Sequence, residues 1–159
     1  VAVTLTFIEL QAMGYTSEGV DQFYSSKAVK EGKDQTWLET PEEQLAFIAN
    51  MGSDDPSAMI DYTLKDIKKM PEMFGQLHST WLKGDMQGMA EVGIVPFKAD
   101  YPSIYEDILV TRNNNWFPKI VEMLNDQPIE FILVGALHLS GPDSVLTKLA
   151  AQGYKIEKL

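Results

Sequence analysis

The chain has 159 residues, of which 45% are hydrophobic and 23% are charged, a composition typical of one globular domain with a sizeable core. Its 13 Lys and Arg against 23 Asp and Glu give a net charge of −10, which argues against binding to nucleic acid or to an anionic membrane surface. The absence of cysteine excludes disulfides, thiolate metal sites and cysteine nucleophiles, and no apolar run reaches the ~18–20 residues of a membrane span.

The first two segments are expected to be helices. Val1–Met13 is apolar throughout and fits either a strand or a buried helix; its length favours a helix ended by Gly14. Ser17 is a candidate cap for a second helix over residues 18–31, which Gly32 ends. The chain opens on this apolar run without a start Met, so we expect it to be part of a longer protein.

A strand-to-helix junction is predicted next. Gln35–Glu39 has the composition of a short strand, and Thr40 with Glu43 forms a capping box around Pro41 at the first helical position. The helix should continue to about residue 51. Glu39 would then lie at the end of a strand, where α/β folds often place their chemistry.

The middle of the chain is predicted to be helical over residues 55–92, with breaks near Pro71 and Gly84. Its many Met residues are most simply explained as adaptable core filling. A loop is expected over residues 93–102, and a long helix over residues 101–125.

The last segments predict a small parallel sheet. Ile129–Val134 is a continuous apolar run typical of a buried strand, and Gly135–Gly141 is a turn of small residues. Asp143 is a candidate cap for a helix over residues 144–152, and Tyr154–Leu159 follows as a second strand. The expected fold class is therefore α/β, mostly helical, with a short parallel strand–helix–strand unit at the C-terminus.

His138 is the sharpest candidate for chemistry, because it directly follows the buried run. An imidazole at that place suits a metal ligand or a general base, and the alternative is a satisfied structural histidine. The same short pattern recurs as Gly75 to His78, which falls inside a predicted helix and is interpreted as an ordinary surface histidine.

Glu39 and Arg112 are the other candidates. A carboxylate at Glu39 could bind metal or move protons, or it could simply favour the positive end of the following helix. Arg112, followed by Asn113, could grip a carboxylate or an oxyanion, or it could pair on the surface with Glu106 or Asp107.

Taken together, these residues resemble the TraB/GumN family, which includes the Tiki proteins and is similar to erythromycin-esterase-like and ChaN-like domains. The matching segments are Leu109–Trp116, Phe131–Asp143 and Gly153–Tyr154, with weaker matches at Gly19–Asp21, Leu38–Thr40 and Trp81. The resemblance covers nearly the whole chain. It implies a layered α/β fold and a metal-dependent hydrolase, described for Tiki as proteolysis.

The resemblance also assigns roles to residues. It implies a catalytic site of Glu39, Arg112, Asn113 and His138, in which His138 and Glu39 bind a divalent metal such as Mn, Co or Zn. It suggests a peptide or small-molecule substrate and an extracytoplasmic location. The family has two Gly-x-x-His motifs, and only the second, ending at His138, is found in the matching place.

These departures shape the functional prediction. The family usually has Glu where this chain has Thr111, and the family domain is incomplete without its first motif. The chain by itself is therefore predicted to be inactive. Two other interpretations stay open, a binding or regulatory module that uses the same cleft without turnover, and a helical scaffold with structural histidines. An exposed sheet edge would favour a homodimer.

Overall fold

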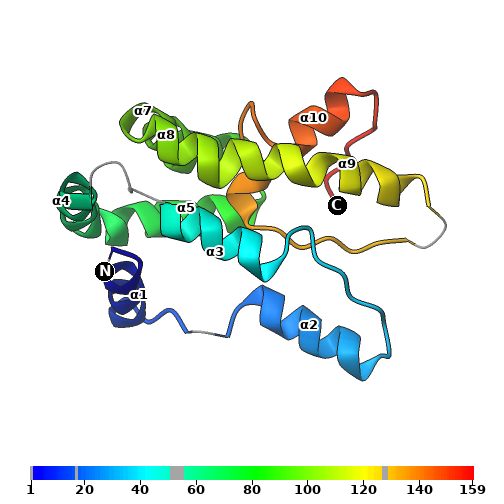
Figure 1. Cartoon of the computed structure of the whole chain (residues 1–159), viewed down its shortest axis with the longest axis horizontal. Helices are drawn as coiled ribbons and strands as arrows, with labels where there is room; N and C mark the ends of the chain where they lie inside the picture. The colour runs from blue at the N-terminus through cyan, green and yellow to red at the C-terminus, as the bar shows by residue number, and fades with distance from the viewer. Residues whose placement is uncertain (1, 17, 51–55, 127–128) are drawn as a thin grey trace.

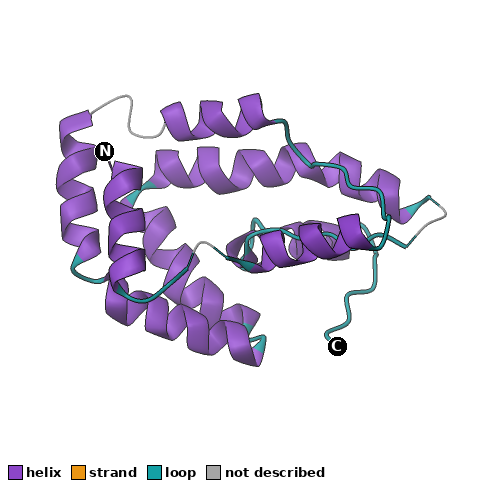
Figure 2. Cartoon of the chain, turned by 90° about the horizontal axis from the view of Figure 1, so that it is seen from below, coloured by secondary structure: helices purple, strands orange, loops and turns teal. Residues whose placement is uncertain are grey.

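The computed structural model describes residues 2–16, 18–50, 56–126 and 129–159, and within these ranges it is built from helices and loops alone (Figure 2). In chain order the helices are α1 (Ala2–Ala12), α2 (Val20–Lys30), α3 (Pro41–Asn50), α4 (Pro56–Ile67), α5 (Met70–Lys83), α6 (Met86–Met89), η1 (Ala90–Ile94), α7 (Val95–Asp100), α8 (Pro102–Tyr105), η2 (Glu106–Thr111), α9 (Arg112–Leu124), η3 (Ala136–Leu139) and α10 (Val145–Ala151). None of the described helices is both long and apolar enough to cross a membrane.

The first two helices end close to the glycines that the sequence predicts as their ends. The helical interpretation of the N-terminal run is confirmed by α1, and Gly14 after it has a φ of 90°, which favours glycine. Helix α2 begins after Gly19, slightly later than predicted, and Ser17 lies outside the described residues. Gly32 follows α2 with a φ of 67°.

The start of α3 is the capping box that the sequence predicts. The backbone N–H of Thr40 donates to Glu43 Oε2 at 2.7 Å, and the backbone N–H of Glu43 donates to Thr40 Oγ1 at 3.2 Å. Pro41 is the first helical residue, where its missing N–H costs nothing. This cap fixes the direction in which the chain enters α3, directly after Glu39.

The predicted parallel sheet is wrong. Residues 129–135 and 154–159 have no regular secondary structure, Gln35–Glu39 is also irregular, and none of the described residues forms a strand. A strand requires hydrogen-bonded backbone neighbours. Here Ile132 and Val134 are instead held by packing against a helical core, while Ile129 is fully exposed. The mostly helical part of the prediction is correct, and the α/β fold class is not.

The loop predicted over residues 93–102 is also wrong, since the chain stays helical there. Helix η1 is a π-helix, in which Val95 N–H donates to Ala90 O, five residues back. Pro96 then falls in the first turn of α7, where its missing N–H is tolerated. Burial of Ile94 in the core compensates for this less common helical geometry.

Most of the buried hydrophobic residues form two clusters in the second half of the chain. One contains Ala90, Ile94, Tyr105 and Leu109, and the other contains Trp116, Ile120, Val145 and Leu149. The continuous helical run of η2 and α9 supplies residues to both clusters, and α10 packs against α9 (Figure 1). In contrast, α2 and α3 contain no fully buried residue. The clusters therefore hold the segments that carry Arg112 and His138.

Candidate functional site

The first turn of α9 supplies three side chains of the candidate site. Arg112 and Trp116 are four residues apart, and Asn113 and Trp116 are three apart, so all lie on neighbouring faces of one helix. The π-helix η2 ends directly before Arg112. Because a π-turn contains more residues than an α-turn, it changes the direction in which the following side chains point, and such turns are frequent at functional sites.

Arg112 is held by Glu39 across a long stretch of sequence. Its Nε donates to Glu39 Oε2 at 3.1 Å, and its Nη2 forms a short ion pair with Glu39 Oε1. Nη1 makes only a long bond of 3.4 Å to Ile108 O. The side chains of Arg112 and Glu39 are 16% and 13% exposed, so this two-bonded pair is largely shielded from water. One edge of the guanidinium is therefore fixed, and Nη1 keeps donor capacity.

Trp116 joins the charged pair to the histidine. Its Nε1 donates to Glu39 Oε2 at 3.1 Å, and its ring lies 4.9 Å from the Arg112 guanidinium carbon. The same ring lies 4.5 Å, centroid to centroid, from the ring of His138. Sequence reasoning did not select Trp116 as a site residue, although its spacing from Arg112 on one helix was available as a signal.

Asn113 fixes the tautomer of His138. Its Nδ2 donates to the backbone carbonyl of Asp143 at 2.9 Å and, more weakly, to that of His138 at 3.5 Å. Carbonyls only accept, so the amide nitrogen must face them, and Asn113 Oδ1 must face His138 Nδ1 at 2.7 Å. An amide oxygen also only accepts, so Nδ1 carries the proton. In the neutral ring Nε2 is then the atom with the free lone pair, and the described residues offer it no hydrogen-bond partner.

The surroundings keep this imidazole neutral. His138 is buried on the short 3-10 helix η3, and its pKa is lowered from 6.5 to about 4. Burial is the largest cause, the positive charge of Arg112 acts in the same direction, and the negative charge of Glu39 partly opposes both effects. At neutral pH, His138 Nε2 is therefore an unprotonated acceptor that lies in the field of Arg112.

A close helix contact holds the turn that carries His138. A Cβ placed on Gly93, in η1, would lie 2.7 Å from Leu137 Cδ2 and 3.2 Å from Leu77 Cδ2, so a larger residue there would force the Leu137 side chain to move. In contrast, a Cβ on Gly135 would meet its nearest neighbour, His138 Cδ2, at an ordinary 3.5 Å. A side chain is therefore less easily accommodated at Gly93 than at Gly135, the glycine of the Gly-x-x-His pattern.

The structure thus brings together the four predicted site residues, while their chemical roles stay predictions. Arg112 binds Glu39 and not the predicted surface partners Glu106 or Asp107. His78 is exposed on α5, beside the ring of Trp81, away from these contacts.

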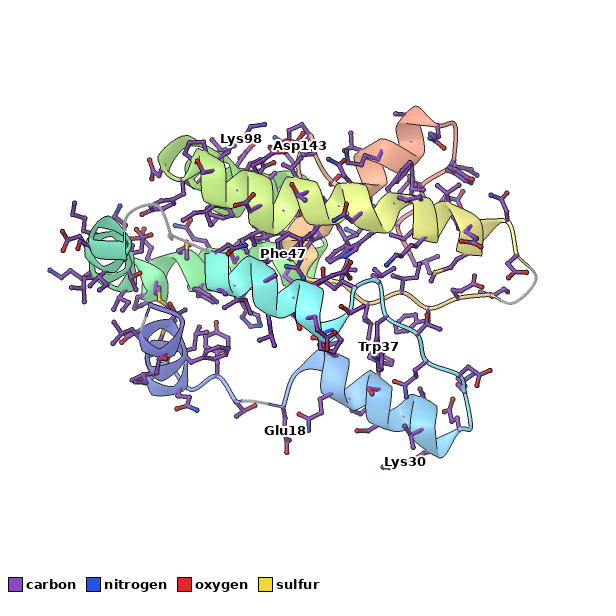
Figure 3. All side chains as sticks on the ribbon, in the orientation of Figure 1. Glu18, Lys30, Trp37, Phe47, Lys98 and Asp143 are labelled. Carbon is purple, nitrogen blue, oxygen red and sulfur yellow. The ribbon has the colours of Figure 1, made fainter. Side chains whose placement is uncertain are left out.

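The cap predicted for the last helix is wrong. Ser144, not Asp143, accepts the backbone N–H of Thr147 at 3.1 Å and caps α10. Asp143 instead binds Lys98, and the two labelled side chains lie close together in Figure 3. The Asp143 carboxylate therefore takes part in contacts with other helices and does not cap α10.

A metal site would have to be built from these same residues. The described part of the chain contains no group of three or more His, Asp or Glu side chains able to hold a metal ion. Both oxygens of Glu39 already accept bonds from Arg112 or Trp116. His138 Nε2 suits a metal ligand, and Glu39 Oε1 accepts only one bond, from Arg112. The metal-binding roles of both residues stay predictions, and two ligands are fewer than the three that hydrolytic zinc usually takes.

Comparison with known proteins gives one result. The model of the TraB/PrgY/gumN family matches residues 1–158. No curated protein and no solved structure matches the chain.

Proposed function

The chain belongs to the TraB/PrgY/gumN family, and on that premise we propose that it carries part of the active site of a hydrolase acting on peptides or other acyl substrates. The observation that supports this proposal is the juxtaposition of a neutral histidine with a fixed tautomer and an arginine with one edge still able to donate. Both groups pack on the ring of Trp116.

His138 would supply the lone pair. A water molecule that attacks a carbonyl carbon must lose a proton, and Nε2 is the unprotonated atom available to accept it. A pKa of about 4 keeps that lone pair free at neutral pH but also makes it a weak base. The proton would pass from Nε2 to the leaving amine when the tetrahedral intermediate collapses.

Arg112 would stabilise the negative charge that develops on the carbonyl oxygen. Glu39 and Trp116 hold one edge of this group in place, which prepares the charge before the substrate arrives. Nη1 is the donor with the weakest existing bond and therefore the one that a substrate oxygen can recruit. Glu39 acts in this scheme by positioning Arg112.

The divalent metal that the family resemblance implies stays a proposal. It would be an alternative use of the same lone pair: His138 Nε2 would bind the metal in place of accepting a proton, because a neutral imidazole is the form that binds metal. Since the described residues do not complete a metal site, we expect little or no turnover by this chain alone.

A thermal melt tests the metal. The wild-type chain and His138→Asn would be melted with and without Mn, Co or Zn, where binding worth about 1 kcal/mol appears as a rise in Tm of roughly 2–4 °C. Asn keeps a donor at the place of Nδ1 but removes Nε2. A rise that is lost in the variant supports metal binding by His138. An equal rise in both proteins, or none in either, contradicts it.

Turnover is tested with a panel of fluorogenic peptides and the longest available form of the protein. Loss of cleavage in His138→Asn, with cleavage unchanged in His78→Asn, supports the hydrolase. Equal cleavage in wild type and His138→Asn shows that His138 has no part in the reaction.

A second candidate function is a binding module that has no turnover. It is favoured by the engagement of both Glu39 oxygens within the protein and by the lack of a three-residue metal group among the described side chains. In that case a peptide would bind with an affinity that depends on Arg112 and His138, and it would be recovered uncleaved.

A further inference from the structure

A polar cluster outside the candidate site contains Asp143, Tyr105 and Lys98. Tyr105 Oη donates to Asp143 Oδ2 at 2.7 Å, and Lys98 Nζ donates to the same oxygen at 2.9 Å. The Lys98 ammonium also lies 5.1 Å from the centre of the Tyr105 ring. Tyr105 is only 2% exposed, so this contact is fixed by the core rather than by the surface.

The charge states of the cluster favour these bonds. The hydrogen bond from Lys98 lowers the pKa of Asp143, which keeps the carboxylate charged. Burial, followed by the bond to Asp143, raises the pKa of Tyr105, so its hydroxyl keeps the proton that it donates. Bonds in which one partner is charged are stronger than neutral ones. The side chain of Asp143 is therefore held firmly by α7 and α8.

The main chain of the same residue reaches the candidate site. The Asp143 carbonyl is the closer of the two acceptors of Asn113 Nδ2, at 2.9 Å against 3.5 Å for the His138 carbonyl. That bond determines which end of the Asn113 amide faces His138. One residue thus joins the cluster on α7 and α8, through its side chain, to α9, through its backbone.

We propose that Asp143 is a positioning residue that, clamped by Tyr105 and Lys98, holds the Asn113 amide in the orientation that keeps the proton on His138 Nδ1. If the Asp143 carbonyl moved away, the Asn113 amide could rotate and present Nδ2 to Nδ1. Nδ1 would then have to accept, the proton would move to Nε2, and the lone pair needed for the proposed function would be lost.

The tautomer of His138 is measured directly by ¹⁵N–¹H NMR of the imidazole ring at neutral pH. In the wild type we expect a protonated Nδ1 and an unprotonated Nε2. In Asp143→Ala, which removes both side-chain bonds, we expect at least a tenth of the population to shift to the other tautomer. Asp143→Asn, which can still accept from Tyr105, should stay closer to wild type and remains useful if the Ala variant does not fold.

The matched control is Asp107→Ala, which removes an exposed carboxylate from the neighbouring helix η2 and should leave the tautomer unchanged. A purely structural role for Asp143 would lower Tm without changing the ring nitrogens. The proposal is therefore overturned if folded Asp143→Ala keeps the wild-type tautomer, or if Asp107→Ala changes it equally.

Only the catalytic importance of the tautomer rests on the proposed function, because the tautomer itself is measured without substrate. A tautomer change in Asp143→Ala, together with equal peptide cleavage by wild type and His138→Asn, would uphold the positioning role and refute the hydrolase. Peptide cleavage that is lost in His138→Asn, together with the wild-type tautomer in Asp143→Ala, would uphold the hydrolase and refute the positioning role.

Discussion

Replacement of His138 by Asn should change how the stability of the protein depends on pH. His138 has a pKa of about 4 in the folded protein against 6.5 as the ordinary value. As pH falls below 6.5 the unfolded chain takes up this proton first, so protonation favours unfolding. The stability linked to the neutral ring is therefore fully present above pH 6.5 and is lost as pH falls towards 4.

The size of the effect follows from the two pKa values. Each pH unit between them corresponds to ~1.4 kcal/mol, which gives about 3 kcal/mol over the whole range and about 2 kcal/mol between pH 7 and pH 5. Asp143 does not obscure this window, because the bond from Lys98 lowers its pKa from 3.8 and its contribution is lost only at lower pH.

Urea unfolding at pH 7 and pH 5 measures the effect. The fall in free energy of unfolding between the two conditions should be about 2 kcal/mol smaller in His138→Asn than in wild type. The variant also loses ring packing on Trp116, so only the difference between the two pH values is compared. His78→Asn, at the exposed histidine of α5, is the matched control and should retain the wild-type difference. An unchanged difference in His138→Asn would refute the argument that burial and Arg112 keep this ring neutral.

Two further substitutions test how the site is built. Glu39→Ala leaves the largely shielded guanidinium of Arg112 without its partner and should lower the free energy of unfolding by about 1–3 kcal/mol, measured by urea unfolding. Gly93→Ala forces a methyl group to within 2.7 Å of Leu137 Cδ2 and should cost about 1–3 kcal/mol, seen as a lower Tm.

Each substitution has a matched control. Glu42→Ala removes an exposed acid from the first turn of α3 and should change stability by less than about 0.5 kcal/mol. If it costs as much as Glu39→Ala, the bond to Arg112 is not the cause. Gly135→Ala meets its nearest neighbour at an ordinary 3.5 Å and should be tolerated better than Gly93→Ala. Equal losses in the two glycine variants would show that the contact with Leu137 is not limiting.

The sequence predicted well those features that depend on neighbouring residues. The capping box at Thr40 and Glu43 is a bond between backbone and side chains three residues apart, so its two residue types are enough to predict it. The end of α1 shortly before Gly14 likewise follows from the ability of glycine to adopt positive φ.

Predictions that depended on distant partners did not succeed as well. The apolar run Ile129–Val134 has the composition of a buried strand, but a strand exists only when another strand pairs with it. Among the described residues none does, and the run is held by side-chain packing on the helices. Asp143 could be interpreted locally only as a helix cap, whereas its partners Lys98 and Tyr105 lie some forty positions earlier in the chain.

The sequence by itself determined the helical majority, several helix ends, the family, and the selection of Glu39, Arg112, Asn113 and His138 as candidates. Only the tertiary structure decided that Glu39 holds Arg112, that Trp116 lies between Arg112 and His138, and that Asn113 sets the tautomer of His138. The physical reason is the separation along the sequence between the groups that interact. Helix caps and turns depend on bonds within a few residues, while the charge, orientation and pKa of a side chain depend on groups that only the folded chain brings into contact.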